Sequence, residues 1–528
     1  MGRLSLYVFA ALILGLGIGS ATGLTGKDEY LLGLRIPLEM IQGDHWWVPF
    51  IDGAPRLKKP PFIYWLGRAS FETFGIGLVS ARGITVAFAL LLLGCTHWLG
   101  KRCAPALAQP RRIALIAAAV LLGMSGLASE SRRLMLDVPV AALSVAAFCL
   151  YLHWIDRRRT RTLLAAALCL SAALLTKGPI ALVGCGSGLL ALWLTDPAAR
   201  WLPLRHWFVH ALTVALALAL PVAWYLYVKR HYGAELAQAA HDELEARQVM
   251  DISADAAIGI LTLALPWSLV AANALWVGRR DPRVRFLGLW LLFSLLPFFF
   301  IRAFERYLIA SLVPLALLAA LALDSGLVPR WTRRIGSLLP ALLALALGLL
   351  LWRWQLDGWF LLALALYWFL RVWWRDEVQP LRLALSAALL WCVGWGLAFP
   401  NLGVNAVPDR VVALARQQPV LLFAGPQPAL LPILSSRPQH QTSQLTANDV
   451  SPGTVISLRD EDRAALDKQL SALAVRTRPV DSYRALTSAG SGIRFAREGA
   501  TREDWRRAWE ERTSTPLMSG VQLLEVLP

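Results

Sequence analysis

Long apolar runs separated by short polar loops occupy roughly the first 400 residues of the chain. A run of about 20 mostly apolar residues forms a helix long enough to cross the hydrocarbon core of a bilayer. About thirteen such runs occur, so the pattern predicts an α-helical, polytopic membrane protein. The predicted spans are residues 5–24, 76–99, 112–128, 138–155, 162–176, 178–195, 207–228, 256–278, 286–301, 306–325, 337–352, 358–372 and 382–399.

The first apolar run fits two interpretations, a cleaved signal peptide and a retained transmembrane helix. No clean small-residue cleavage site precedes Lys27, and further apolar runs follow. We therefore expect an uncleaved first helix.

Lysine and arginine residues concentrate in every second loop between the predicted spans. Cytoplasmic loops are enriched in these residues, so threading thirteen spans places all of the basic loops on the cytoplasmic side. The basic groups are Lys101/Arg102/Arg111/Arg112, Arg157/Arg158/Arg159/Arg161, Arg279/Arg280/Arg283/Arg285, Arg330/Arg333/Arg334 and Arg371/Arg375/Arg382. The loops left facing outward are residues 25–75, 129–137, the turn at 177, 229–255, the turn at 302–306, the turn at 354 and the tail from about 400.

The composition agrees with a membrane protein. Only 16% of the residues are charged, against roughly a quarter in soluble domains, and the mean hydropathy is +0.52. A formal charge of +17 could indicate a nucleic-acid partner, but the topology already accounts for the basic loops, so we expect none. The six cysteines lie in or beside apolar runs, which predicts neither a disulfide framework nor a metal site.

The tail has a different composition from the rest of the chain. It is polar, with short apolar runs at 419–423 and 453–457 and a helical pattern over 459–473. We predict a transmembrane domain over residues 1–400, with outward loops 25–75, 129–137 and 229–255, and a small soluble α/β domain over 401–528. No catalytic constellation occurs in the tail, so we interpret it as a stabilising lid or interaction domain.

The first outward loop combines paired acids with paired lysines. Asp28 and Glu29 directly follow the first span, where a carboxylate can orient or deprotonate an acceptor or simply favour a helix N-terminus. Lys58 and Lys59 can hold a lipid phosphate, or extend from the apolar surface to the head groups. The aromatic residues nearby, including Tyr64, can form an interfacial belt. Spacing alone does not choose between these roles.

The order of these motifs resembles the first periplasmic loop of the bacterial GT-C glycosyltransferases. The nearest likeness is to the aminoarabinose transferases that modify lipid A and to the protein O-mannosyltransferases. Over about 400 residues, further matching segments are 131–139, the Thr176-Lys177-Gly178-Pro179 turn, Arg306-Tyr307-Leu308 with Pro314, and 221–247 with His241, Glu243 and Arg247.

The resemblance implies a GT-C fold and an enzyme that takes a sugar from a polyprenyl phosphate outside the cytoplasm. No Walker loop or dinucleotide-binding glycine motif occurs, which agrees with a lipid-linked donor. The expected acceptor is lipid A phosphate, and the expected location is the bacterial inner membrane with the site and the tail on the periplasmic side. Other envelope glycans or proteins stay open as acceptors.

The resemblance also implies roles for particular residues. Asp28 or Glu29, together with Asp137, would act on the acceptor; gapless counting favours Glu29 for the family's first acidic position. Asp137 could instead cap a helix. The residues expected near the donor phosphate are Lys59, Lys58, Arg247, Arg302 and Arg306. The residues expected to contact substrate are Tyr64, Arg133, Lys177 and Glu243, although Lys177 also suits a structural role at its tight turn.

No cofactor is certain, and a divalent metal at His241 with carboxylates such as Glu243 is a weak signal. Lys58 stands where the family often has Glu, which allows a different donor or acceptor within the class. The alternatives to an enzyme are a lipid-linked-sugar transporter and a non-catalytic binding protein. A transporter would show internal repeats and charges midway along the spans, and the chain shows neither clearly.

Overall fold

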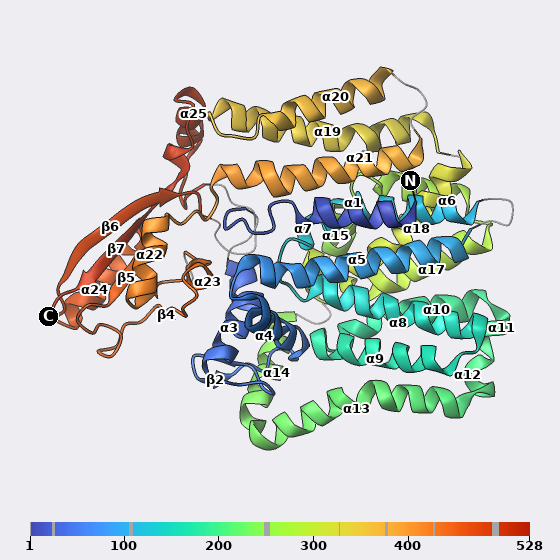
Figure 1. Cartoon of the computed structure of the whole chain (residues 1–528), viewed down its shortest axis with the longest axis horizontal. Coiled ribbons are helices and arrows are strands. Elements are labelled where there is room, and N and C mark those ends of the chain that lie inside the picture. The colour runs from blue at the N-terminus through green and yellow to red at the C-terminus, as the bar shows by residue number, and fades with distance from the viewer. Residues whose placement is uncertain are drawn as a thin grey trace.

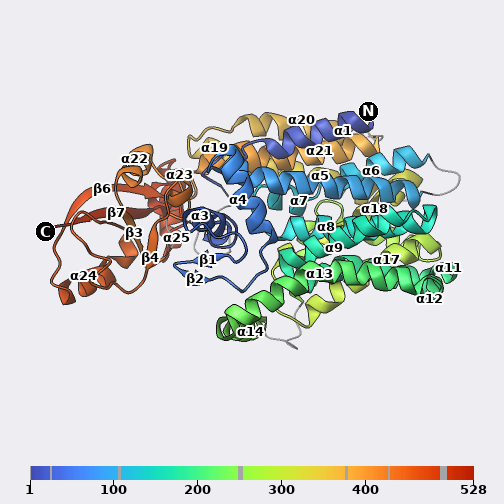
Figure 2. The ribbon, with the colours of Figure 1, turned by 60° about the horizontal axis from the view of Figure 1, so that its bottom comes forward.

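The computed structural model describes residues 2–23, 27–104, 109–247, 254–326, 328–374, 379–425, 428–487 and 496–528. A bundle of roughly parallel helices forms one part of the elongated molecule, and a sheet with its own helices forms the other (Figure 1). The same two parts are seen after rotation, with the C-terminus at the far end of the sheet (Figure 2). The predicted combination of a helical membrane part and a small C-terminal α/β domain is confirmed.

The apolar runs form helices because a chain in hydrocarbon must satisfy its own backbone hydrogen bonds. The helices of this part are α1 (Arg3–Gly15), α5 (Leu78–Arg102), α6 (Pro110–Leu122), α7 (Ser125–Glu130), α8 (Asp137–Arg157), α9 (Thr160–Lys177), α10 (Ile180–Thr195), α11 (Pro197–Arg200), α12 (Leu202–Arg205), α13 (Trp207–His231), α14 (Gly233–Arg247), α15 (Asp255–Leu263), α16 (Ser268–Val277), α17 (Pro282–Leu295), η2 (Leu296–Phe299), η3 (Glu305–Ser311), α18 (Leu312–Ser325), α19 (Arg330–Arg353), α20 (Phe360–Trp374), α21 (Pro380–Val393), η4 (Gly394–Ala398) and η5 (Phe399–Leu402).

The first predicted span, 5–24, is helical only as far as Gly15, and residue 24 lies outside the described residues. The other predicted spans fall mainly on helical residues. By length and composition, seven helical segments among the described residues can cross a membrane, or eight if one bent pair counts as a span. Four further apolar helices are shorter, with 10–17 residues. The chain is therefore a multi-pass membrane protein, while the count of thirteen spans stays a prediction.

Two of the predicted spans are not continuous helices. Residues 256–278 form α15 and α16, which meet at an angle of 107°. Pro266 lies in the break, where its ring and missing N–H end a helix. The predicted span 112–128 divides into α6 and α7, and the backbone N–H of Ser125 donates to the Leu265 carbonyl, 2.9 Å away. The two breaks therefore face each other and satisfy backbone groups that a continuous helix would satisfy internally.

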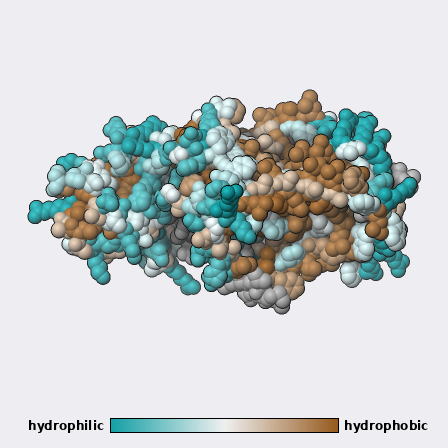
Figure 3. Space-filling view, turned by 90° about the horizontal axis from the view of Figure 1, so that it is seen from below, coloured by the Kyte–Doolittle hydropathy of each residue, from teal (hydrophilic) through white to brown (hydrophobic). Residues whose placement is uncertain are grey.

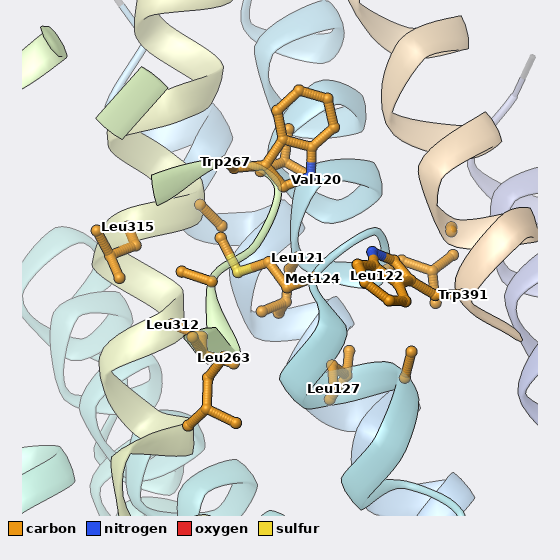
Figure 4. Close-up of a cluster of buried hydrophobic side chains, with 14 of the residues drawn as sticks. Val120, Leu121, Leu122, Met124, Leu127, Leu263, Trp267, Leu312, Leu315 and Trp391 are labelled. Atoms are coloured by element: carbon orange, nitrogen blue, oxygen red, sulfur yellow. The ribbon is translucent and has the colours of Figure 1, made fainter. Parts of the chain in front are cut away.

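Burial separates the central helices from the peripheral ones. The apolar windows of α8 and of the η3–α18 segment are 78% buried within the protein, whereas that of α13 is only 17% buried. Figure 3 shows the resulting apolar surface over the helical part, which suits contact with lipid. The interior is filled by close-packed side chains from α6, α7, α15, α18 and α21, including Met124, Trp267 and Trp391 (Figure 4).

The first outward segment folds into a small subdomain at the end of the helical part nearest the sheet (Figure 2). It consists of α2 (Lys27–Glu29), η1 (Tyr30–Leu34), α3 (Arg35–Gln42), β1 (Phe50–Ile51), β2 (Ala54–Pro55) and α4 (Phe62–Phe74). The amphipathic pattern up to Met40 is realised in α3, which buries Ile36, Leu38 and Met40 completely. These side chains pack with residues of α4 and with Leu134 and Leu136 of the second outward loop.

The tail folds around one mixed sheet, as its apolar runs predict. The sheet order is β4-β3-β5-β7-β6; β3 is parallel to β4 and β5, and β7 is antiparallel to β5 and β6. Its strands are β3 (Val420–Phe423), β4 (His440–Thr442), β5 (Val455–Arg459), β6 (Thr477–Ala485) and β7 (Ser519–Val526). Its helices are α22 (Asp409–Gln417), α23 (Leu431–Leu434), α24 (Arg463–Ala472) and α25 (Arg502–Glu510), together with the short η6 (Asp460–Asp462) and η7 (Thr515–Leu517).

The C-terminal domain is fastened to the first outward segment by apolar contacts. Ala429, Leu430 and Ile433, in and beside α23, belong to the same buried cluster as the side chains of α3. The hydroxyl of Thr22 also donates to the Pro400 carbonyl, 2.8 Å away, beside the junction. The domain therefore supports the segment that carries the paired acids.

We expect Ile433→Ala to lower the free energy of unfolding by about 2–5 kcal/mol, because it deletes a buried branched side chain and leaves a cavity. Thermal or denaturant unfolding of the purified protein in detergent measures the change. Val480→Ala, at an exposed position of β6, is the matched control and should change stability by less than about 0.5 kcal/mol. Equal effects of the two variants would contradict the docking of α23.

Candidate active site

Four charged side chains, from four separate segments that the sequence predicts to face outward, meet at one end of the helical part. Asp137 begins α8 and forms an ion pair with Lys177, the last residue of α9. Arg306 of η3 lies 3.5 Å from Asp137 (Nε to Oδ2) and 3.2 Å from Asp28 (Nη1 to Oδ2). Arg306 therefore joins the carboxylates of the first and second outward loops.

The local sequence explains why Asp137 and Lys177 lie at the ends of their helices. A carboxylate is stabilised at a helix N-terminus and an ammonium at a helix C-terminus, which suits Asp137 and Lys177. Gly178 follows with φ of +60°, a conformation open to glycine, and so ends α9 directly after the lysine. The Lys177 ammonium also lies 3.3 Å from the ring centroid of Tyr307, which adds a cation–π contact.

Burial distinguishes the members of this charged cluster. The side chains of Asp137 and Lys177 are 2% and 3% exposed, and that of Asp28 is 22% exposed. Buried charges are stable only with partners of opposite sign, so Lys177 has the contacts of a residue that positions Asp137. Asp28 is the carboxylate of the cluster most accessible to a bound molecule.

The structure gives the two adjacent acids, Asp28 and Glu29, different surroundings, although the sequence alone did not distinguish them. The Glu29 side chain is completely buried, and both of its oxygens accept hydrogen bonds from Arg82, at 3.0 and 2.9 Å. The Leu134 N–H donates to the same carboxylate at 2.9 Å. Glu29 therefore fastens the first loop to α5 and to the second loop, whereas Asp28 faces the charged cluster.

Lys58 and Lys59 both contact acids of α14. The Lys58 ammonium lies 3.1 Å from Asp242 Oδ2, and the Lys59 ammonium lies 2.6 Å from Glu243 Oε1. The hydrogen bond from Lys58 lowers the pKa of Asp242 below its ordinary value. The indole N–H of Trp224, in α13, donates to the Trp47 carbonyl at 3.0 Å and joins the first segment to the helix that precedes α14.

The remaining predicted residues take varied positions. Arg133 forms an ion pair with Glu130, and its side chain is mostly buried. Tyr64 is fully buried in the apolar cluster of the first segment, where burial raises its pKa to about 12, so its surroundings are those of a core residue. Arg302 is exposed in the turn before η3. Arg247 ends α14, and its side chain lies outside the described residues.

Few side chains near His241 could act as metal ligands. Its ring lies 3.2 Å from Glu245, and both side chains are about two-thirds exposed. Across the described ranges, no three His, Cys, Asp or Glu side chains come together. The residues in place do not form a metal-binding set, and a metal stays a prediction.

Sequence reasoning missed several residues of this region. Arg82, Asp242 and Tyr307 were not among the predicted site residues, although Tyr307 and Asp242 adjoin Arg306 and Glu243. Arg82 carried a signal, because an ionisable residue inside an apolar span usually has a specific partner. That partner, Glu29, is 53 positions away, so no local pattern reveals it.

A small cavity of about 10 Å³, with room for about one water molecule, lies beside Asp137 between α8, α10, α17, η2 and η3. Its walls are mostly apolar and include Val140, Ile180, Val183 and Phe298, with Asp137 and Tyr307 also in the lining. Three serines add polar groups, and two of them, Ser294 and Ser311, are joined by a hydrogen bond of 2.8 Å. The cavity therefore has mostly apolar walls beside the charged cluster, and its volume is too small for a lipid or a sugar.

Comparisons with known proteins identify a family and relatives that the chain resembles. The family described as dolichyl-phosphate-mannose-protein mannosyltransferase matches residues 33–232. The undecaprenyl phosphate-alpha-4-amino-4-deoxy-L-arabinose arabinosyl transferase of Shewanella sediminis is 24% identical over 329 residues, covering 58% of this chain and 56% of the relative. The protein of the same name from Pseudomonas aeruginosa is 27% identical over 316 residues, covering 55% and 54%. The chain spans about half the length of these relatives.

Solved structures match over almost the whole chain. ArnT from Cupriavidus metallidurans in the apo state gives a TM-score of 0.67 at 18% identity, covering 89% of this chain and 95% of that protein. The same protein bound to undecaprenyl phosphate gives a TM-score of 0.68 at 17% identity, covering 98% and 97%. The chain therefore has the GT-C fold, and the predicted resemblance to GT-C glycosyltransferases is confirmed.

The two adjacent acids should differ in their effect on stability. We expect Glu29→Gln to lower the free energy of unfolding by about 3–5 kcal/mol, because it removes the carboxylate charge of a fully buried ion pair with Arg82. Asp28→Asn should cost less than about 1 kcal/mol, since its single ion pair is partly exposed. Unfolding of the two purified variants in one detergent measures both changes. Similar losses would show that Glu29 is not the structural member of the pair.

Proposed function

We propose that this chain is a GT-C glycosyltransferase that transfers a sugar from a polyprenyl phosphate to an acceptor at the outer face of the membrane. The leading version is transfer of aminoarabinose from undecaprenyl phosphate to a phosphate of lipid A. The observation that carries the proposal is the meeting of the charged side chains Asp28, Asp137, Lys177 and Arg306, which come from four segments far apart in the chain.

The charges of the region suit this chemistry. The bond between C1 of the sugar and the phosphate oxygen breaks, and the lipid phosphate leaves with the bonding electrons. Lys58 and Lys59 can stabilise the charge on that phosphate. Asp28, held by Arg306, can orient the acceptor oxygen that bonds to C1 or accept its proton. A phosphate acceptor is already deprotonated and needs orientation more than a base.

The names of the relatives support the donor class. Two relatives are named for a sugar carried on undecaprenyl phosphate, and the Cupriavidus protein has been solved with undecaprenyl phosphate bound. The second candidate function is transfer to a protein, which the match of residues 33–232 to a protein mannosyltransferase family favours. The two functions share the donor chemistry and differ in the acceptor.

The distribution of charge supports an outward-facing site in the bacterial inner membrane. Arg102 pairs with Asp156, and Arg112 pairs with Asp324, 2.9 Å apart. These residues lie near the ends of α5, α6, α8 and α18 that point away from the charged cluster. Basic loops of this kind face the cytoplasm, so the cluster and the C-terminal domain face the periplasm in this proposal.

The transferase activity is testable with the protein in liposomes that contain an undecaprenyl-phosphate sugar and lipid A. Asp137→Asn and Lys59→Ala should each lower transfer at least about 100-fold, because they remove charges that orient the acceptor or stabilise the leaving phosphate. Mass spectrometry of the product lipids measures transfer. Glu245→Gln, an exposed acid on α14, is the control and should keep full activity. Full activity of a correctly inserted Lys59→Ala protein would overturn the role of that lysine.

The acceptor can be identified in cells. Lipid A from cells with and without the gene should differ by the mass of a pentosamine, and the addition should return when the gene is restored. An unchanged lipid A under inducing conditions would reject lipid A as the acceptor and would direct the search to other glycans and to proteins.

The ion pairs of α14 imply that the lysines must exchange partners when the donor binds. Asp242 and Glu243 hold the two ammonium groups that the lipid phosphate would contact. We expect Asp242→Asn/Glu243→Gln to lower the KM for the donor severalfold, because the lysines no longer lose those carboxylates on binding. Initial rates against donor concentration measure the effect. A raised KM would show instead that the acids hold the lysines in their working positions.

A further inference from the structure

A second cavity lies on the outer end of the molecule, where the turn between α19 and α20 meets α25. Its volume is about 290 Å³, and its walls are Trp352, Arg353, Gln355, Leu356, Asp357, Trp359 and Arg512. None of these residues belongs to the charged cluster of the candidate active site. In Figure 1 the cavity's helices, α19, α20 and α25, lie at the opposite side of the molecule from α9 and α14.

The cavity is rich in donors that suit an anion. Arg512 makes no ion pair or hydrogen bond with the described residues of the chain. The guanidinium of Arg353 lies 5.2 Å from the ring centroid of Trp509, a contact that leaves its N–H groups available. Asp357 is the one acid in the lining, so the walls carry a net positive charge. Two guanidinium groups suit the planar, bidentate contacts that a phosphate accepts.

The surroundings place this cavity at the level of lipid head groups. Arg353 ends the apolar stretch Leu338–Arg353, so its guanidinium stands where the helix leaves the hydrocarbon. Four exposed tryptophans surround the junction, and tryptophan is enriched at the boundary between membrane and water. They are Trp352, Trp359, Trp505 and Trp509, with exposed fractions of 58%, 62%, 42% and 54%.

The junction is built from both parts of the molecule. Trp354 of the α19–α20 turn is buried and stacks on Trp505 of α25, with ring centroids 6.5 Å apart. Trp505 and Trp509 are four residues apart and so lie on one face of α25. The side chain of Arg506 is instead paired with Glu503 of the same helix, and that of Arg507 with Glu511, directly after the helix. One face of α25 therefore meets the membrane part, while Arg506 and Arg507 are neutralised by nearby acids.

We propose that this cavity binds the phosphate headgroup of an anionic phospholipid of the outer leaflet, with Arg353 and Arg512 as its ligands. The tryptophans would then lie among the lipid's glycerol and upper acyl groups. Basic pockets beside membrane helices recognise lipid head groups through the same combination of charge and depth. A bound lipid would join the C-terminal domain to the bilayer at a site separate from sugar transfer.

Native mass spectrometry of the full-length protein, released from detergent with defined lipids, tests the proposal. At equal lipid concentration, the wild-type protein should retain phosphatidylglycerol in preference to phosphatidylcholine. Arg353→Gln/Arg512→Gln should lower the retained phosphatidylglycerol about tenfold, because both phosphate ligands are lost. Arg506→Gln/Arg507→Gln removes the same charge elsewhere on the C-terminal domain and should keep wild-type retention.

The outcomes separate this site from simpler explanations. Equal losses in both double variants would mean that net charge alone attracts the lipid, and would overturn the proposal. Unchanged retention in Arg353→Gln/Arg512→Gln would overturn it as well. Wild-type protein that binds inorganic phosphate at this cavity without preferring phosphatidylglycerol would identify an anion site, not a lipid site. Arg353→Lys/Arg512→Lys keeps the charge and should show intermediate retention, which guards against a loss caused by misfolding.

Discussion

Charged side chains within a helical membrane part are stable only when they are paired, because removing an ion from water costs several kcal/mol. The structure meets this requirement by pairing residues from different outward segments. Arg82 of α5 holds Glu29 of the first loop, and Arg306 of η3 holds Asp28 and Asp137. Each pair joins positions far apart in the chain, so the need to neutralise buried charge determines how the outward loops meet. The candidate active site is a consequence of that pairing.

The same constraint gives two neighbouring acids different surroundings. Successive residues of a helix point about 100° apart, so Asp28 and Glu29 cannot face the same partners. Glu29 meets the guanidinium of Arg82 and the Leu134 N–H, where it loses all contact with solvent. Asp28 stays partly exposed beside Arg306. A structural acid and a site acid can therefore be adjacent in sequence, the first holding the loop that presents the second.

The first outward segment also connects the two parts of the molecule. Its apolar side packs against Leu134 and Leu136 from the second loop and against Leu430 and Ile433 from the C-terminal domain. Its basic end meets α14 through Lys58 and Lys59. Movement of α14 or of the C-terminal domain would therefore shift the segment that carries Asp28. The tail, in which no catalytic pattern occurs, contributes to the site by supporting this segment.

The sequence by itself determined the helical membrane class of the protein, and it predicted on which side of the membrane each loop lies. Apolar runs and alternating basic loops predicted helices whose outward loops meet, and the contacts of Asp28, Asp137, Lys177 and Arg306 join four of those loops. Motif order predicted the GT-C resemblance. Each of these features depends on residues that are close together in the sequence or on their order along it. They are therefore recognisable from the sequence alone. Tertiary structure decided the rest: the break at Pro266, the choice between Asp28 and Glu29, and the partners of Lys58 and Lys59. Those outcomes depend on which distant charges and backbone groups are buried together, and spacing along the chain does not carry that information.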